Sequence, residues 1–241
     1  MKKVIYQLLI LAGLSSCGGS DKDDSLPTSG VITGSVLLFE EGSTPASPAG
    51  MRISIENPPS AAISALTDNS GKFTLENVPF GTYSLVYEKE GYGTYLKPEV
   101  VHEAAITPIL QTPSLGKISS TQITEVRMEK SGSSLITYVT TNPAGTSNNR
   151  RYIRYFFSNS PDVSSSNFTA FSETYVVQDT PYYKAFTTQE LNQLGINPSG
   201  TIYMRVYGDS FFSNEYLDLA SKKKVFPNLN PSTVAAKSVS F

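Results

Sequence analysis

Residues 67–92 read TDNSGKFTLENVPFGTYSLVYEKEGY, and this run carries the clearest structural pattern in the chain. It opens with TDNSG, which is typical of a tight turn because Asp and Asn side chains bond to nearby backbone groups and Gly accepts a positive φ. The turn lies between two expected strands, residues 61–67 and 72–78, so it predicts a β-hairpin. Apolar residues then alternate with polar ones and would fill one side of a sandwich core: Phe73, Leu75, Val78, Tyr83, Leu85 and Tyr87.

Alternation of period two continues along most of the chain from residue 30 onward. Turn residues recur about every eight to twelve residues, which is the spacing typical of a β-sandwich. One short helix is expected at residues 188–194, because Thr187 and Glu190 have capping-box spacing and Gly195 suits a left-handed C-terminal position. The expected strands are 31–40, 50–56, 61–67, 72–78, 82–88 and 100–110, then 122–128, 134–140, 151–158, 173–177, 201–207 and 223–226.

The sequence QTPSLGK at residues 111–117 interrupts the alternation with Pro and Gly and predicts a short linker. The linker divides the folded part of the chain into two units. We therefore predict an all-β protein of two tandem β-sandwich domains, residues 30–113 and residues 114–241.

The first unit resembles the carboxypeptidase regulatory-like domains, which are small transthyretin-like sandwiches. The resemblance lies in the TDxxGxF turn, the VPxGxY entry into the next strand and the GY pair within residues 67–92. Gly34 and Val36 in the opening strand, and Pro48 with Gly50 before the second, fit the same pattern. This resemblance implies an accessory module without catalytic residues, of a kind common in bacterial surface proteins and outer-membrane receptors.

The second unit is similar to fibronectin type III domains in one region. Residues 194–208, LGINPSGTIYMRVYG, match the turn and alternating penultimate strand of that family. Ser199 separates the Pro and Gly of the usual turn, and Ile202 stands where an inward Tyr is usual. The resemblance implies an Ig-like or fibronectin-like sandwich for residues 114–241.

The N-terminal residues 1–16 resemble a bacterial lipoprotein signal peptide. Lys2 and Lys3 precede an apolar run, residues 4–14, that is too short to span a bilayer. The sequence LSSC ending at Cys17 resembles the lipobox, in which the Cys becomes the acylated N-terminus of the mature chain. The resemblance implies membrane attachment through acylated Cys17, since several acyl chains anchor a protein stably. The alternative is an ordinary signal peptide with a chance Cys.

Residues 17–29 contain no periodic apolar residues and predict a disordered tether after the acylated Cys17. Within it, SDKDD at residues 20–24 resembles the signal that sends Bacteroidetes lipoproteins to the outer leaflet of the outer membrane. A solvated linker would have a similar composition. We expect a lipid-anchored outer-membrane protein exposed at the cell surface.

Composition excludes several classes of function. A single Cys and a single His cannot form a zinc site of Cys and His ligands or a disulfide within the chain. A net charge of −2 gives no electrostatic footprint for nucleic acid. No GxSxG motif positions a nucleophile, and no motif places paired carboxylates. We expect no metal, no cofactor and no catalytic residues; a hydrolase would need Asp and Glu side chains that converge in a concave site.

A face of Tyr and Arg is the candidate binding surface. If residues 151–158 and 201–207 are neighbouring strands with Ile, Met and Val inward, the alternate side chains point outward. Tyr and Arg are enriched at binding hot spots. The same pattern would also arise from a ladder that stabilises the sheet, or from a face covered by the first domain. The candidate residues are Tyr152, Arg154, Tyr203, Arg205 and Tyr207.

Other aromatic and basic residues are assigned to lesser roles. Residues 222–224, all Lys, predict either a solvated hairpin or charged residues that protect an edge strand against aggregation. His102 is expected to be a strand residue. Five aromatic residues are expected in loops, where they could clamp a glycan or a protein: Tyr182, Tyr183, Phe211, Phe212 and Tyr216.

These patterns predict a non-catalytic, lipid-anchored surface protein that acts as an accessory binding module, with polysaccharide as the favoured ligand. A structural or adhesion protein that contacts other outer-membrane proteins is the alternative. A hydrolase is the less favoured third reading.

Overall fold

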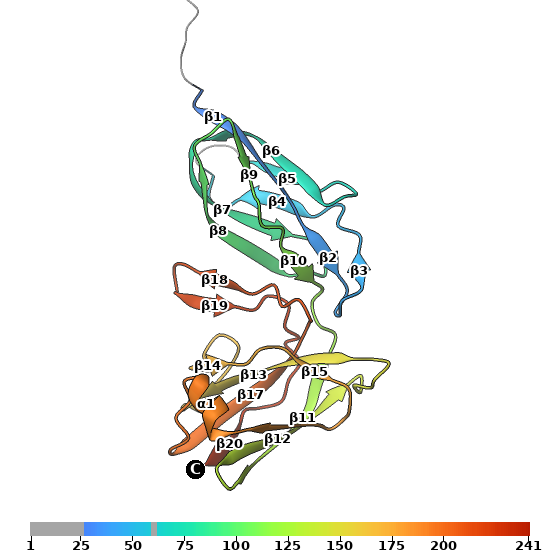
Figure 1. Cartoon of the computed structure of the whole chain (residues 1–241), viewed down its shortest axis with the longest axis vertical. Coiled ribbons are helices and arrows are strands. Elements are labelled where there is room, and N and C mark those ends of the chain that lie inside the picture. Colours follow the sequence, from blue (N-terminus) through green and yellow to red (C-terminus); the bar gives the residue numbers. More distant parts are fainter. Residues whose placement is uncertain (1–26, 59–61) are drawn as a thin grey trace, which may run out of the picture.

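A computed structural model describes residues 27–58 and 62–241 of the chain. Strands make up 50% of the described residues and helix 3%. The predicted all-β class is therefore confirmed. Figure 1 shows two β-rich units stacked along the long axis of the molecule, with a hairpin between them.

The first unit is built from two groups of strands around one core. One group has the orders β6-β1-β9 and β10-β2-β3, and the other has the order β5-β4-β7-β8. Ile32 and Leu75 from the first group and Ile53 from the second meet in one buried cluster. The strands are β1 (Ser29–Ser35), β2 (Leu37–Phe39), β3 (Pro45–Ala46), β4 (Arg52–Ile55), β5 (Ser64–Leu66), β6 (Lys72–Pro79), β7 (Gly81–Glu88), β8 (Thr94–His102), β9 (Ile106–Pro108) and β10 (Ser114–Gly116).

The turn at residues 67–71 forms as predicted, but it does not close a hairpin. Asp68 Oδ1 accepts hydrogen bonds from the backbone N–H groups of Ser70 at 2.8 Å and Lys72 at 2.9 Å. Gly71 has a φ of +79°, and a Cβ there would lie 2.2 Å from the Val36 carbonyl oxygen. The flanking strands pair elsewhere, β5 with β4 and β6 with β1. The turn therefore carries the chain from one sheet to the other, and the predicted hairpin is wrong.

Two other boundaries in the first unit differ from the sequence prediction. The expected strand at 100–110 is two strands: β8 begins earlier, at Thr94, and β9 pairs in parallel with β1. The expected linker at 111–117 contains β10, which pairs in parallel with β2. Leu115 on β10 is 2% exposed and lies in the core of the first unit, so this segment is part of the first sandwich.

The second unit is a sandwich of a sheet with the order β11-β12-β16 and a sheet with the order β14-β13-β17-β20, in which β15 also pairs with β13. Leu135 and Val139 from the first sheet pack with Tyr155 from the second. Its elements are β11 (Gln122–Ser131), β12 (Ser134–Asn142), β13 (Arg151–Ser158), β14 (Ala170–Phe171), β15 (Tyr175–Val177), β16 (Tyr182–Phe186), α1 (Thr188–Gln193), β17 (Thr201–Asp209), β18 (Tyr216–Asp218), β19 (Lys223–Val225) and β20 (Lys237–Ser240).

The predicted helix is confirmed as α1. The Thr187 side chain accepts from the Glu190 backbone N–H, and the Glu190 side chain accepts from the Thr187 N–H, so the capping box is complete. Gly195 follows the helix with a φ of +79°. These contacts are local in sequence, which is why the pattern alone located the helix.

Some of the predictions for the other aromatic and basic residues are confirmed and others are wrong. Residues 222–224 lie in the turn and second strand of the β18–β19 hairpin, which confirms the predicted hairpin. His102 ends β8 as a buried strand residue, and its ring bonds to Thr107 Oγ1 at 2.7 Å. Tyr182 and Tyr183 lie in β16 and Tyr216 lies in β18, so the prediction that they are loop residues is wrong.

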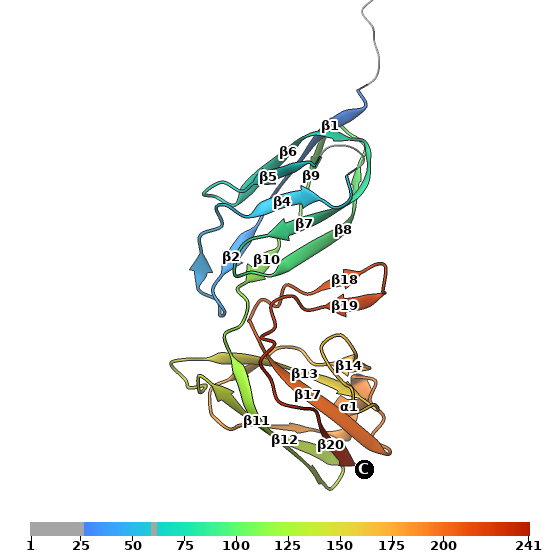
Figure 2. The ribbon, with the colours of Figure 1, turned by 180° about the vertical axis from the view of Figure 1, so that it is seen from behind.

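The two units meet along the segment that follows β17. Figure 2 shows the β18–β19 hairpin of the second unit lying against the first. Phe212 packs on Phe39 with ring centroids 4.1 Å apart. Arg151 forms an ion pair with Glu41 at 3.0 Å, across the same junction. The junction therefore contains packed and charged contacts between residues far apart in the chain.

Candidate functional site

The predicted Tyr and Arg face lies on neighbouring strands, as expected. Strands β13 and β17 pair antiparallel, with Arg154 opposite Tyr207. Ile153, Met204 and Val206 are fully buried in the core between the sheets. The two strands therefore orient their side chains as the period of two requires.

The face is nevertheless buried, which corrects the expectation that it is exposed. Tyr152 is 7% exposed, Arg154 is 3% and Tyr207 is 6%. Tyr203 and Arg205 are half-buried. A period of two tells which side of the sheet a residue occupies but does not tell what covers that side.

A second, smaller hydrophobic cluster covers this face. Phe156 and Tyr207 on the sheet are buried under Phe226, which follows β19, and under Val163 from the loop after β13. The Phe156 and Phe226 rings meet edge to face with centroids 5.1 Å apart. The cover over Phe156 and Tyr207 comes from loops of the second unit itself. Tyr152 is covered by Phe211, with ring centroids 5.9 Å apart, and also lies against Gly42 of the first unit.

Arg154 holds the cover in place through a buried polar network. Its Nε donates to Asp209 Oδ2 at 2.8 Å, and a second guanidinium nitrogen donates to the Ser172 carbonyl at 2.7 Å. The guanidinium also lies 4.9 Å from the Phe226 ring centroid and 3.2 Å from a Glu215 carboxylate oxygen. A fully paired, buried arginine of this kind is a structural group and is not free to bind a ligand.

Arg205, unlike Arg154, is only half-buried. It lies over the Tyr207 ring at 5.5 Å. Its Nε is buried, and the described part of the chain offers that nitrogen no hydrogen-bond partner. Tyr203 and Arg205 thus form a half-covered remnant of the predicted face.

An exposed row of Arg and Tyr lies instead on the opposite sheet. We call Arg127, Tyr138 and Tyr183 the tyrosine row. Arg127 on β11 pairs with Tyr138 on β12, and Tyr138 pairs with Tyr183 on β16, so the three side chains are cross-strand neighbours. The Arg127 guanidinium lies 4.5 Å from the Tyr138 ring centroid, and the two Tyr rings are 5.6 Å apart.

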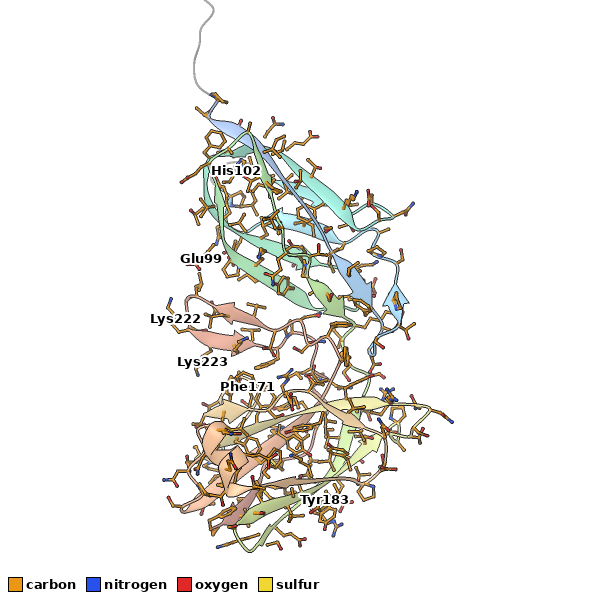
Figure 3. The ribbon with its side chains drawn as sticks, in the orientation of Figure 1. Glu99, His102, Phe171, Tyr183, Lys222 and Lys223 are labelled. Atoms are coloured by element: carbon orange, nitrogen blue, oxygen red, sulfur yellow. The ribbon has the colours of Figure 1, made fainter. Side chains whose placement is uncertain are left out.

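The tyrosine row is accessible and firmly mounted. Tyr183 is 55% exposed, and the Arg127 side chain is 61% exposed. The opposite faces of the same strands place Val126, Leu135 and Val139 in the core. Figure 3 shows Tyr183 at the end of the molecule opposite to the entry of the chain into β1. The row is an exposed aromatic and basic strip on a packed sheet.

Sequence reasoning missed the row because it placed residues 182–183 in a loop. The run YYKAF does alternate, with Tyr183 exposed between the more buried Tyr182 and Lys184. That alternation could have been recognised in the sequence, as could the positions of Arg127 and Tyr138 on the polar sides of their predicted strands. The pairing of the three strands could not, because they are far apart in the sequence.

The predicted lipidation residue Cys17, with the predicted signal peptide and most of the predicted tether, lies outside the described residues. Among the residues that the structure describes, no helix combines the length and the apolar character of a membrane span.

The carboxylates with shifted pKa values all have lowered ones. Hydrogen bonds from Ser70 and the Lys72 backbone lower the pKa of Asp68, and the Lys184 side chain lowers that of Glu190. Ser221 lowers the pKa of Asp218. Within residues 27–58 and 62–241, no group of His, Cys, Asp or Glu side chains is arranged to hold a metal ion. These shifted carboxylates serve as hydrogen-bond acceptors in turns and at the helix cap.

No family model and no curated protein matches the chain. It is similar to a proposed carbohydrate-binding protein from Bacteroides uniformis at 12% identity and a TM-score of 0.31, covering 89% of this chain and 100% of that one. A DUF3823 protein from Parabacteroides merdae has 12% identity and a TM-score of 0.29, covering 87% and 98%. A DUF3823 protein from Bacteroides ovatus has 9% identity and a TM-score of 0.28, covering 88% and 98%. The transthyretin-like and fibronectin-like assignments stay predictions.

Proposed function

We propose that the chain is a non-catalytic, lipid-anchored cell-surface protein that captures polysaccharide on the tyrosine row. The observation that supports this proposal is the cross-strand line of Arg127, Tyr138 and Tyr183, in which Arg127 and Tyr183 are exposed and Tyr138 is half-buried. Tyr rings offer apolar area for the faces of sugar rings, and their hydroxyls and the guanidinium offer hydrogen bonds. A sheet with a packed opposite face holds these groups in place before a ligand arrives.

The position of the row suits a protein held by its N-terminus. The chain enters the first unit at β1, while Tyr183 lies at the far end of the second. An acyl anchor at Cys17 would leave the row pointing away from the membrane, where a polymer is accessible. Replacing Cys17 with Ala should abolish incorporation of labelled palmitate and release the protein from the membrane fraction. Unchanged fractionation of the Cys17→Ala protein would contradict the anchor.

Affinity electrophoresis tests the binding site. The soluble protein from residue 27 onward, run in gels containing starch, xylan, mannan or pectin, should be retarded by at least one polymer. Tyr183→Ala should weaken that retardation by about tenfold, equivalent to about 1.4 kcal/mol. Tyr138→Ala should act in the same direction, since its ring adjoins that of Tyr183 at 5.6 Å.

Tyr203→Ala is the matched control, because Tyr203 is a half-buried Tyr on the opposite sheet. Equal losses in the Tyr183 and Tyr203 variants would contradict the tyrosine row as the site. Absence of retardation by all four polymers would contradict polysaccharide capture. In that case, crosslinking on intact cells that recovers one dominant protein would favour the structural or adhesion role.

A further inference from the structure

A cleft in the second unit is separate from the tyrosine row. It has a volume of about 350 Å³ and opens between β15, β16 and α1. Small-molecule sites in proteins commonly begin at about 300 Å³. We call it the α1 cleft; its lining residues are Ser172, Glu173, Tyr175, Phe186, Glu190, Gln193 and Leu194.

The aromatic wall of the α1 cleft is rigid. Tyr175 packs edge to face against Phe186 with ring centroids 6.1 Å apart and against Tyr155 at 5.6 Å. Phe186 and Tyr155 are both fully buried. The Tyr175 ring is therefore held by the core on one side while it borders the cleft on the other.

One cation already occupies the aromatic wall. Lys184 Nζ lies 5.4 Å from the Tyr175 ring centroid and 5.0 Å from that of Phe186. The same ammonium donates to Glu190 Oε1 at 2.7 Å, while Glu190 Oε2 accepts from the Thr187 N–H at 2.8 Å. The chain thus supplies its own counterion to Glu190, and a cationic ligand would compete with Lys184 for these rings.

The Ser172 hydroxyl is already bonded to the Glu173 carbonyl and the Tyr155 N–H, which leaves the side chains of Glu173, Gln193 and Tyr175 to face a ligand. Glu173 is exposed, and the part of the chain that the structure describes gives it no ion-pair partner. Gln193 is exposed and brings both amide donors and an amide acceptor. Burial, reinforced by the charges of Glu173 and Glu190, raises the pKa of Tyr175 to about 12. The Tyr175 hydroxyl therefore keeps its proton at neutral pH and remains a donor.

We propose that the α1 cleft binds one neutral, hydroxyl-rich sugar ring, separately from the tyrosine row. Glu173 would accept from two ring hydroxyls, and Gln193 and Tyr175 would bond to others. The two carboxylates against one ammonium disfavour an anionic sugar, and the bound Lys184 disfavours a cation. The proposal rests on the proposed function for the class of ligand, so its test must separate the two sites.

Short oligosaccharides provide that test. Saturation-transfer NMR with cellotriose, maltotriose, xylotriose and mannotriose should show binding of at least one by the protein from residue 27 onward. Glu173→Gln, which replaces a charged acceptor by a neutral one, and Tyr175→Phe, which removes a hydroxyl donor, should each weaken binding of that trisaccharide by about fivefold to tenfold. Both substitutions keep the shape of the side chain, and unchanged thermal unfolding would verify the fold.

The outcomes separate the two proposals. Polymer retardation that is lost in Tyr183→Ala but kept in Glu173→Gln, with trisaccharide binding showing the reverse, supports two sites. Polymer retardation without any trisaccharide binding overturns the α1 cleft and leaves the proposed function intact. Binding of trigalacturonate as tight as that of the neutral trisaccharides overturns the charge argument and with it the α1 cleft proposal. If the parent protein shows neither polymer retardation nor trisaccharide binding, both proposals are overturned.

Discussion

Asn214 and Gly116 exchange two hydrogen bonds across the junction between the sandwiches. Gly116 donates its backbone N–H to Asn214 Oδ1 at 2.7 Å, and Asn214 Nδ2 donates to the Gly116 carbonyl at 2.8 Å. The same Nδ2 donates to the Tyr92 carbonyl at 2.7 Å. Asn214 is 5% exposed and has a φ of +51°. A single amide therefore satisfies backbone groups from two segments of the first unit.

Asn214→Ala should destabilise the protein by about 2 to 3 kcal/mol, because it leaves three buried backbone groups without partners. Asn214→Gly is the control, since glycine tolerates the positive φ without supplying the hydrogen bonds. Urea unfolding followed by circular dichroism measures both. If the glycine variant were as stable as the parent protein, the loss in Asn214→Ala would come from backbone strain and the hydrogen-bond argument would fail.

Arg154→Met should cost about 3 to 5 kcal/mol, because it leaves the carboxylate of Asp209 buried without its cation. Adding Asp209→Asn should restore part of the loss, since it removes the unpaired buried charge and the single Asn oxygen can still accept from either Thr174 Oγ1 or the Ser210 N–H, which bond to different oxygens of Asp209. The double-mutant cycle is read from urea unfolding. Strict additivity of the two substitutions would contradict a coupled pair.

The sequence predicted what depends on neighbouring residues. Thr187 and Glu190 form the capping box, and alternation put Ile153 and Met204 in the core. The sequence-based prediction failed where strand pairing depends on residues that are far apart in the chain. The turn ending at Gly71 looks like a hairpin turn, yet its flanking strands bond to β1 and β4, whose registers no local pattern reveals.

The candidate site shows the same division. The alternation of side chains along each strand correctly placed Arg154 and Tyr207 on one side of their sheet. The prediction that these side chains are exposed was wrong because Phe226, nearly twenty residues after Tyr207 in the chain, packs over that side of the sheet. Tyr183 is exposed for the converse reason: β16 pairs with β12, and the described structure places the Tyr138 ring beside Tyr183 but no loop cluster over it.

Acid should weaken the protein partly through Glu215. Burial alone raises the pKa of this carboxyl, but the hydrogen bond from Lys224 and the charge of Arg154 outweigh burial and leave it below its ordinary 4.5. A folded-state pKa below the unfolded value gives stability that is present above about pH 4.5 and is lost as pH falls through the folded pKa. Glu215→Gln should therefore be less stable than the parent at neutral pH.

The difference between parent and Glu215→Gln should shrink as pH falls below about 4.5, and thermal unfolding across this range measures it. Glu129→Gln is a matched control because Glu129 is exposed on β11, away from the junction. A gap between Glu215→Gln and the parent that stays constant down to about pH 3 would contradict the assigned linkage.

Gly71 and Gly50 offer a direct test of why the first sandwich needs glycine in its turn. Both have a positive φ, +79° and +75°, but only a Cβ at Gly71 meets backbone, at 2.2 Å from the Val36 carbonyl oxygen. Gly50→Ala should cost only the backbone strain of about 1 to 2 kcal/mol. Gly71→Ala should destabilise the protein clearly more, because a methyl group at residue 71 would collide with the Val36 carbonyl oxygen unless β1 moved away from β6. Equal losses in urea unfolding would show that conformation alone requires the glycine, and that the close approach of the turn to the opening strand adds nothing to the stability of the fold.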